Sequence, residues 1–302
     1  MAGGQERALR QRVRSNQNVR KITRAMELIA ASRIAKDQQR VAAARPYAEL
    51  MTTVVAHLTK AGANLDQPLL ETRDPVRTVG ILAITADKGL AGGYNANVTR
   101  AADQAVAAAR RDGLDAKVYV AGKKGVNYFR FRHQDVAQSW TGFSELPRAE
   151  DARAIAGAIR DDFVAGEIDR LELIYTQFLS LGNQKVATRR LLPLDRSALE
   201  EIGGGSEHSG PEAAYEFEPE PEAILERLLP LYVESRVYSA LLEAAASEHA
   251  ARQRAMKSAT DNASDLIKLY ERKANRVRQE AITTELVEVT GAAAALAAGS
   301  GS

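Results

Sequence analysis

The chain has no cysteine, and its 302 residues include only four histidines. Without cysteine it can form no disulfide, thiolate metal site or thiol nucleophile. The histidines, at positions 57, 133, 208 and 249, do not have the spacing of a zinc site. No apolar run reaches the roughly 18 residues of a membrane span, and the N-terminus lacks the apolar core of a signal peptide. These absences argue against a disulfide-bonded, zinc-binding or membrane-spanning protein and fit a cytosolic one.

Two stretches of the chain carry charge of mainly one sign, the first basic and the second acidic. Residues 5–45 hold eleven Lys and Arg but only three Asp and Glu, whereas residues 199–226 hold nine acids and neither Lys nor Arg. The formal net charge of the whole chain is only +2, so it is not a polyelectrolyte binder overall. Asymmetry of this kind is typical of partner surfaces or tails.

Glycine and proline are both missing from residues 5–45 and from residues 231–290. At 1.5 Å per residue, these runs could form helices of roughly 60 Å and 90 Å. An isolated projecting helix is only marginally stable in water, because helices in proteins are stabilised mostly by packing an apolar face. We therefore expect the two ends of the chain to pair as an antiparallel coiled coil.

The spacing of apolar residues supports this pairing. Val19, Ile22, Met26 and Ile29 are separated by three, four and three residues, the spacing of a coiled-coil seam. The C-terminal run shows the same spacing, with breaks at polar residues and alanines, so an irregular pair is expected. The predicted seam consists of Val19, Ile22, Ile29, Leu266, Ile282, Leu286 and Val289.

The middle of the chain has a different pattern. Short apolar runs that read as strands alternate with helical stretches at residues 95–111 and 149–164. Such alternation predicts a Rossmann-like α/β domain with a mainly parallel sheet. The expected strands lie at residues 78–87, 116–122, 170–178 and 185–194. The expected domain organisation is an N-terminal helix and connection at 1–75, the α/β domain at 76–200, a connector at 201–222, a C-terminal helix at 223–290 and a tail at 291–302.

The glycine-rich loop ADKGLAGGYN, at residues 86–95, follows a strand and opens a helix, where backbone N–H groups can hold a phosphate. Its glycines, Gly89, Gly92 and Gly93, match neither GxxxxGK[ST] nor GxGxxG. A tight connection that needs positive φ explains them better. A nucleotide-binding α/β protein that uses this loop is kept as the alternative.

The basic N-terminal helix raises a second alternative, which is electrostatic binding of nucleic acid. The apolar stripe around Met26 and the lack of a nucleic-acid-binding motif argue against it. A solvated basic face, or one that meets an acidic protein, is at least as well supported.

Several long segments together resemble one family. KITRAMELIAASRIAKDQ, TADKGLAGGYN and ASEHAARQRAMKSATDNASDLI resemble, in this order, the N-terminal helix, the glycine loop and the C-terminal helix of the gamma subunit of F-type ATP synthase. The resemblance extends from about Gln5 to Leu296. One departure is Ala91, where the family often has a cysteine, so no thiol chemistry is required at this loop.

The resemblance implies a non-catalytic shaft that couples proton flow through a membrane ring to ATP synthesis or hydrolysis by rotation. It implies no nucleotide site, no cofactor, no bound metal, no nucleic acid and no membrane span of its own. The implied partners are the alpha and beta subunits, the epsilon subunit and the ring of c subunits. The implied location is the cytoplasmic face of a bacterial inner membrane, because no mitochondrial presequence precedes the first helix.

The resemblance also assigns roles to individual residues, each of which could instead be ordinary helix surface. Contact with the beta subunit is implied for Lys21, Met26, Arg252, Arg278, Gln279, Thr283 and Glu285. A foot that faces the membrane ring is implied for Tyr215, Phe217 and Glu218.

Overall fold

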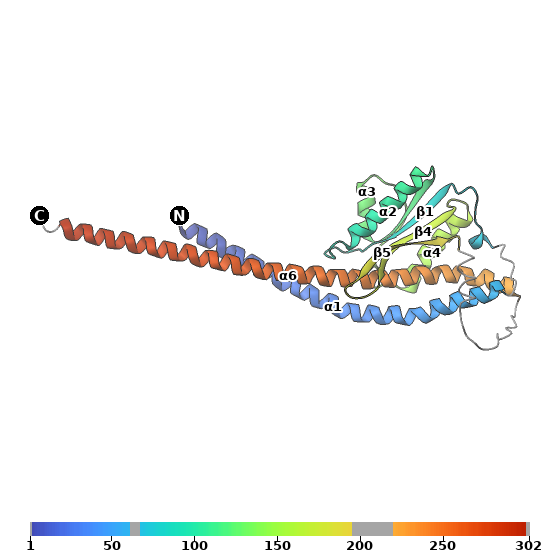
Figure 1. The fold of residues 1–302 in the computed structure, drawn as a ribbon, viewed down its shortest axis with the longest axis horizontal. Helices are drawn as coiled ribbons and strands as arrows, with labels where there is room; N and C mark the ends of the chain where they lie inside the picture. Colours follow the sequence, from blue (N-terminus) through green and yellow to red (C-terminus); the bar gives the residue numbers. More distant parts are fainter. Residues whose placement is uncertain (1, 61–66, 195–219, 300–302) are drawn as a thin grey trace. The chain divides into compact units, whose positions relative to one another are not determined.

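The computed structural model describes residues 2–60, 67–194 and 220–299. The chain separates into two compact units. The helical unit comprises Met1–Ile29 and Gln253–Ser302, and the sheet unit comprises Ala30–Arg252. Two helices, α1 (Ala2–Lys60) and α6 (Pro221–Gly299), contribute residues to both units (Figure 1).

The sheet unit is built on five strands in the order β3-β2-β1-β4-β5. β1 pairs in parallel with β2 and with β4, β2 pairs in parallel with β3, and only β5 is antiparallel to its neighbour. The prediction of a mainly parallel sheet is therefore confirmed. The strands are β1 (Thr78–Ile84), β2 (Asp115–Ala121), β3 (Val136–Trp140), β4 (Arg170–Phe178) and β5 (Gln184–Leu192).

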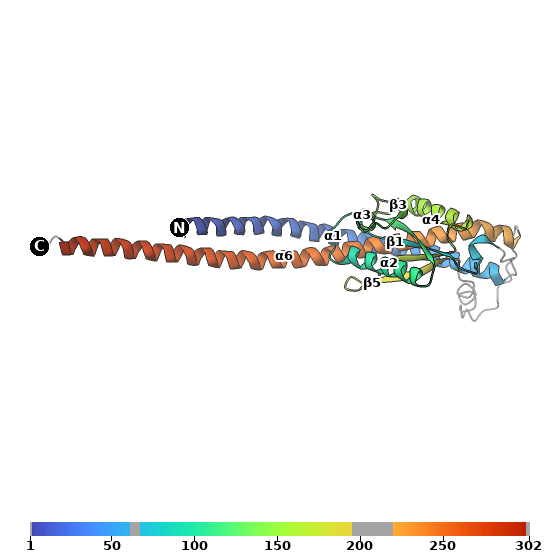
Figure 2. The same ribbon diagram turned by 90° about the horizontal axis from the view of Figure 1, so that it is seen from above.

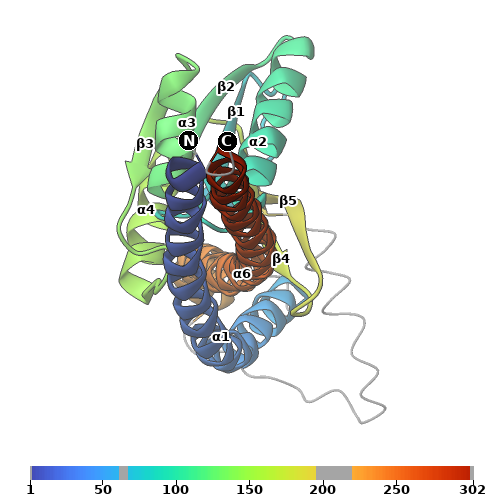
Figure 3. The same cartoon turned by 90° about the vertical axis from the view of Figure 1, so that its left-hand side faces the viewer.

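Helices cover both faces of the sheet, as Figures 1 and 3 show. α2 (Tyr94–Arg111) and α3 (Lys123–Phe131) pack on one face, over a core that includes Ile81 and Phe129. α4 (Ala149–Val164) packs on the other face together with parts of α1 and α6, and a short 3-10 helix, η1 (Pro68–Leu70), joins that core. Both faces are thus buried, as expected for parallel strands.

α1 and α6 each contain a proline. α1 continues past the end of the proline-free run at residues 5–45, whereas the predicted C-terminal helix at 223–290 already includes its proline. Pro46 lies inside α1 and Pro230 inside α6. An interior proline lacks the N–H of a helix hydrogen bond and costs about 3 kcal/mol. Here apolar burial beyond each proline offsets that loss. The buried side chains on the far sides of the prolines are Met51, Val55, Leu58, Leu225 and Leu229.

The helical unit is an antiparallel pair of helices, as predicted. The Thr23 hydroxyl on α1 lies 2.8 Å from the Thr260 hydroxyl on α6. The Arg12 guanidinium lies 5.7 Å from the centre of the Tyr270 ring, so the two contacts run in opposite directions along the helices. Figure 2 shows the two segments side by side.

The predicted seam is one residue out of register. All seven of its side chains are between 39% and 61% exposed. At three of the seven positions the next residue along the chain is buried instead: Thr23 rather than Ile22, Ala30 rather than Ile29, and Ile267 rather than Leu266.

The error has a physical cause. Two neighbouring stripes on α1 satisfy the same three-and-four spacing, one of them apolar and the other small or polar. In the helical unit the second stripe faces α6, and its members Thr23 and Glu27 are both 8% exposed. On α6 the buried face consists of Met256, Ala263, Ile267 and Ala274. The larger apolar stripe is left on the outside of the pair.

α6 also carries apolar residues beyond the part that pairs with α1. Residues 282–290 are all exposed, and they include Ile282, Leu286 and Val289. If the register set by Thr23 and Thr260 continues, α1 begins opposite the residues just before Ile282. Figure 2 shows the C-terminal end of α6 extending past the N-terminal end of α1. This stretch has no α1 segment opposite it within the described residues.

The register can be tested with a matched pair of variants. Ala263→Leu inserts bulk into the buried face and should destabilise the helical unit by about 1–3 kcal/mol. Ile22→Ala removes an exposed side chain and should change stability by less than about 0.5 kcal/mol. Hydrogen exchange of the amides of residues 10–29 in the isolated chain measures both. Faster exchange in Ile22→Ala, with Ala263→Leu unchanged, would restore the predicted seam.

Candidate functional site

The glycine-rich loop connects β1 to α2, as the sequence predicts, and several of its polar groups bind other parts of the chain. The Asp87 carboxylate accepts hydrogen bonds from the backbone N–H groups of Lys123 (2.9 Å), Gly142 (2.8 Å) and Ser144 (3.0 Å). The Lys123 N–H belongs to the first residue of α3, a position where a helix favours an anion. Asp87 therefore supplies that anion and also holds the loop that follows β3.

The backbone of the glycine loop bears out part of the predicted geometry. Gly92 has a φ of 57°, in the left-handed region, as expected for a tight connection. Leu90 also has a positive φ, of 61°, and its side chain is exposed. Gly93 has an ordinary negative φ. The Gly89 carbonyl points at α6 and accepts hydrogen bonds from the Arg252 guanidinium at 3.2 Å and 3.4 Å.

Arg252 is buried, with 5% of its surface exposed. Its guanidinium donates to Glu248 at 2.5 Å, one helical turn earlier on α6. It also lies 3.4 Å from the Glu145 carboxylate, in an ion pair that lacks hydrogen-bond geometry. The resemblance implies an external contact for this residue, but in the chain as described its charge is engaged internally.

Glu145 is a functional candidate that the sequence analysis missed. It lies in the loop between β3 and α4, and its carboxylate accepts hydrogen bonds from Lys88 at 2.8 Å and from Arg33 on α1. Together with Arg252, three cations from three separate segments surround it. No motif or spacing marks this glutamate. The loop that carries Glu145 follows β3, and β3 itself is not among the predicted strands, so the sequence did not place this loop.

We call the set Arg33, Lys88, Glu145, Glu248 and Arg252 the Glu145 junction. Burial by itself raises the pKa of Glu145, but the hydrogen bonds and charges of Lys88 and Arg33 outweigh it and lower the pKa to about 2. Burial raises the pKa of Glu248 despite the opposing Arg252 charge. Glu145 is therefore ionised at any physiological pH.

A second buried pair joins α1 to α6 beside the junction. The Nδ1 atom of His249 lies 2.5 Å from the Asp37 carboxylate, and both side chains are at most 5% exposed. Because a carboxylate only accepts, Nδ1 carries the hydrogen. Arg40 also donates to Asp37, at 3.3 Å. This pair fixes the two helices against each other at one level.

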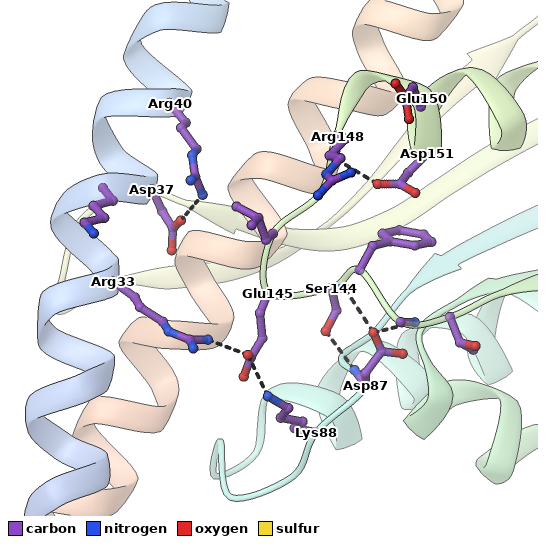
Figure 4. Close-up of a pocket in the computed structure, with 15 residues that line it drawn as sticks. Arg33, Asp37, Arg40, Asp87, Lys88, Ser144, Glu145, Arg148, Glu150 and Asp151 are labelled. Carbon is purple, nitrogen blue, oxygen red and sulfur yellow. Dashed lines mark hydrogen bonds and ion pairs between the residues drawn. The ribbon is translucent and has the colours of Figure 1, made fainter.

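An open pocket of about 780 Å³ lies between α1 and the loop that carries Glu145. Figure 4 shows Arg33, Asp37 and Arg40 extending from α1 on one side of it, with Ser144 and Glu145 opposite. Its charged groups are largely paired with one another, so it presents mixed charge and no cation cluster. Among the described residues, no group of three His, Asp or Glu side chains could hold a metal ion. Nor does any helix in those residues have the length and hydropathy to cross a membrane.

The other residues singled out by resemblance lie on helix surfaces. Met26 is half-buried on α1, and Lys21 is exposed one turn earlier. On α6, four further residues are exposed and lie close together along the helix. They are Arg278, Gln279, Thr283 and Glu285. The foot residues Tyr215, Phe217 and Glu218 lie outside the described residues.

Comparison with known proteins identifies the family. A profile of the ATP synthase family matches residues 5–296. The chain is 49% identical over 300 residues to the ATP synthase gamma chain of Frankia casuarinae, covering 98% of this chain and 99% of the relative. It is 47% identical over 305 residues to the gamma chain of Mycolicibacterium smegmatis, covering 96% and 97%. The chain therefore belongs to the ATP synthase family, and within it to the gamma chains.

Solved structures have the same fold. A chain in the central stalk and c-ring structure of Tetrahymena thermophila mitochondrial ATP synthase is 26% identical, with a TM-score of 0.58 over 79% of this chain and 99% of that one. A chain of the Euglena gracilis mitochondrial ATP synthase has a TM-score of 0.67 at 19% identity, over 99% of this chain and 97% of that one. The fold is that of the ATP synthase central stalk.

The low pKa of Glu145 predicts a specific pH dependence of stability. A carboxyl group whose pKa falls from 4.5 to about 2 on folding stabilises the protein above pH 4.5, and this stabilisation is lost as the pH falls toward 2. The Lys88 and Arg33 side chains are 66% and 43% exposed. Because solvent weakens such pairs, Glu145→Gln should lower the free energy of unfolding by about 1–2 kcal/mol at pH 7.

The measurement is urea unfolding of the isolated chain at several pH values. The difference between wild type and Glu145→Gln should shrink below pH 4.5. Glu167→Gln is the matched control, because Glu167 forms an ion pair with Lys117 at 3.4 Å but is 63% exposed. A difference for Glu145→Gln that did not change with pH would contradict the assigned pKa.

Proposed function

We propose that this chain is the rotating shaft of a proton-translocating ATP synthase. Rotation of a membrane ring turns the sheet unit and the helices together, and the asymmetric helix pair drives each catalytic site of the head through its states in sequence. Such a shaft acts by binding each state differently, since only a difference in interaction free energy can shift an equilibrium. The chain holds no nucleotide of its own.

The observation that carries this proposal is the outward-facing apolar stripe of the helical unit. Val19, Ile22 and Ile29 are each at least 45% exposed, although their spacing also suits a coiled-coil seam. A row of large aliphatic side chains along one face of a helix pair marks a surface for another protein. The exposed Ile282, Leu286 and Val289 extend the same property along α6.

The basic residues of α1 fit a moving contact. Arg20, Lys21 and Arg24 are exposed beside the apolar stripe. Arg24 also donates to Glu27 at 2.8 Å. Exposed ion pairs contribute only about 0–1 kcal/mol each, so a basic face can pass acidic partner loops without locking onto one. We assign Lys21, Met26, Arg278, Gln279, Thr283 and Glu285 to contact with the beta subunits.

The alternative, a nucleotide site in the glycine loop, has less support. The Asp87 carboxylate occupies the N-terminus of α3, and the Gly89 carbonyl is bound by Arg252. The N–H of Ala86 donates to the Asn95 side chain at 2.8 Å. A phosphate bound at the N-terminus of α2, which this loop opens, would lie beside the Asp87 carboxylate, and two anions repel each other.

The proposed shaft has partners at both of its ends. The head consists of alpha and beta subunits, and the foot contacts the epsilon subunit and the ring of c subunits. By similarity, the foot residues are Tyr215, Phe217 and Glu218. The complex lies on the cytoplasmic face of the membrane, and this chain is attached to it through its partners.

Co-purification with enzymatic assay tests the proposal directly. A tagged chain recovered from its native membranes should bring alpha, beta and epsilon subunits in a fixed ratio. The purified chain should show no saturable ATP hydrolysis, and mixing it with alpha and beta subunits should produce hydrolysis accompanied by rotation. Recovery of the chain alone, or saturable nucleotide binding abolished by a Gly92 substitution, would favour the glycine-loop alternative.

Met26→Lys tests the contact face. The change places a charge within the apolar stripe, where it meets the partner rather than the seam. We expect normal assembly and a lower ratio of protons moved to ATP hydrolysed, by roughly twofold or more. Lys257→Gln on α6 is a control at an exposed position. Unchanged coupling in a fully assembled Met26→Lys complex would exclude Met26 from the contact.

A further inference from the structure

The Glu145 junction joins parts of the sheet unit that also meet through apolar packing and through a few other polar contacts. One of these is the hydrogen bond from the Ser247 hydroxyl of α6 to the Thr176 carbonyl of β4, at 3.0 Å. Glu145 and Lys88 belong to loops at the ends of strands, whereas Arg33 and Arg252 belong to α1 and α6. One carboxylate therefore links the loops of the sheet to both long helices. Arg252 adds a second link by donating to the Gly89 carbonyl.

From this geometry we propose that Glu145 is the positioning residue that makes the sheet and the two helices turn as one body. The inference rests on the proposed shaft function and assigns part of that function to a contact inside the chain. It predicts a failure mode that differs from loss of a partner contact. The sheet would slip against the helices, and rotation of the foot would be incompletely transmitted to the head.

Apolar packing and hydrogen bonds differ in how strongly they depend on direction. Apolar packing between the sheet and the helices is driven by a non-directional effect, although its close-packed side chains also interlock and resist sliding. Charge-assisted hydrogen bonds require a defined distance and angle, so they resist displacement along the interface as well. Within the described residues, the junction joins both loops to both helices. Glu145, Glu248 and Arg252 are largely shielded from solvent. The Lys88 and Arg33 side chains that bind Glu145 are 66% and 43% exposed.

The apolar contact at the same place is small. Ala86, Ala91 and Tyr94 from the glycine loop form a cluster against which Ala251 of α6 packs. Two of the three cluster members are alanines, which bury little surface. The charged contacts of Arg252 and Glu145 therefore account for most of the specific attachment of this loop to α6.

The arrangement of Asp87 supports the same role for the loop. Its carboxylate holds the N–H groups of Gly142 and Ser144, and its own N–H donates to the Ser144 hydroxyl at 2.9 Å. The loop that carries Glu145 is thus fixed to the end of β1. A force that acts on Glu145 is therefore transmitted through this loop to the sheet.

Glu145→Gln in the assembled complex tests the inference. The amide is nearly isosteric but lacks the charge that holds three cations. We expect normal assembly, ATP hydrolysis close to wild type and a proton-to-ATP ratio reduced by about twofold or more. Glu167→Gln, at an exposed ion pair of the same unit, should leave this ratio unchanged. If Glu145→Gln does not assemble, Arg33→Gln breaks one link at a more exposed position and gives the same readout.

A reversible cross-link distinguishes a mechanical role from a merely structural one. Because the chain has no cysteine, Ala91→Cys and Ala251→Cys can be added to Glu145→Gln to attach the loop to α6 by a single disulfide. In complexes whose other subunits lack cysteine, oxidation should restore the ratio, and a reductant should lower it again. Mass spectrometry verifies the bond.

The outcomes separate this inference from the proposed function. If wild-type complexes move no protons on ATP hydrolysis, the shaft function itself fails. If wild-type complexes are coupled and Glu145→Gln is equally coupled, only the role of Glu145 is overturned. The role is also overturned if coupling falls in Glu145→Gln but a verified disulfide does not restore it.

Discussion

A helix as long as α1 or α6 is stable in water only where it buries a face, and this constraint governs both units of the chain. In the sheet unit the two helices bury a large apolar face, and side chains such as Val55 and Val237 are completely buried. In the helical unit fewer large side chains are buried: the seam combines Met256 and Ile267 with small or polar residues such as Thr23 and Ala263. The same two helices are therefore well supported in one unit and weakly supported in the other. Under the proposed function, the surrounding head supplies the burial that the helical unit lacks.

The sequence predicted secondary structure best where a hydrophobic pattern was compatible with only one kind of element. β4 and α4 have the predicted bounds, because an apolar run flanked by turn residues and an amphipathic run each allow a single interpretation. The register of the helix pair could not be predicted, since stripes one residue apart, through Ile22 and through Thr23, satisfy the same spacing. Hydrophobic spacing shows that a face will be covered, but it does not show whether the chain's own helix or another protein covers it. Glu145 was beyond reach for a different reason: a contact among four distant segments leaves no local signature.

The glycine loop shows how a phosphate-binding pattern can serve an internal purpose. A strand, a glycine-rich turn and a helix N-terminus form the geometry that nucleotide sites use. In this chain Asp87 places its own carboxylate at the N-terminus of α3, and Gly89 offers its carbonyl to a buried arginine. At α3, a neighbouring helix, the preference of a helix N-terminus for an anion is thus met by a side chain of the glycine loop. The same local architecture thereby becomes an attachment point between a sheet and a helix.

The outward apolar stripe also has a consequence for the cell before any complex exists. A newly made chain exposes a row of aliphatic side chains around Ile22 and another around Leu286, with nothing in its own described structure to cover them. Patches of this kind promote self-association and make a free polypeptide a target for chaperones and proteases. The supply of this chain therefore has to match the supply of the proteins that receive it. An excess of one component would precipitate or be degraded, so balanced synthesis is a requirement set by the surface of a single helix pair.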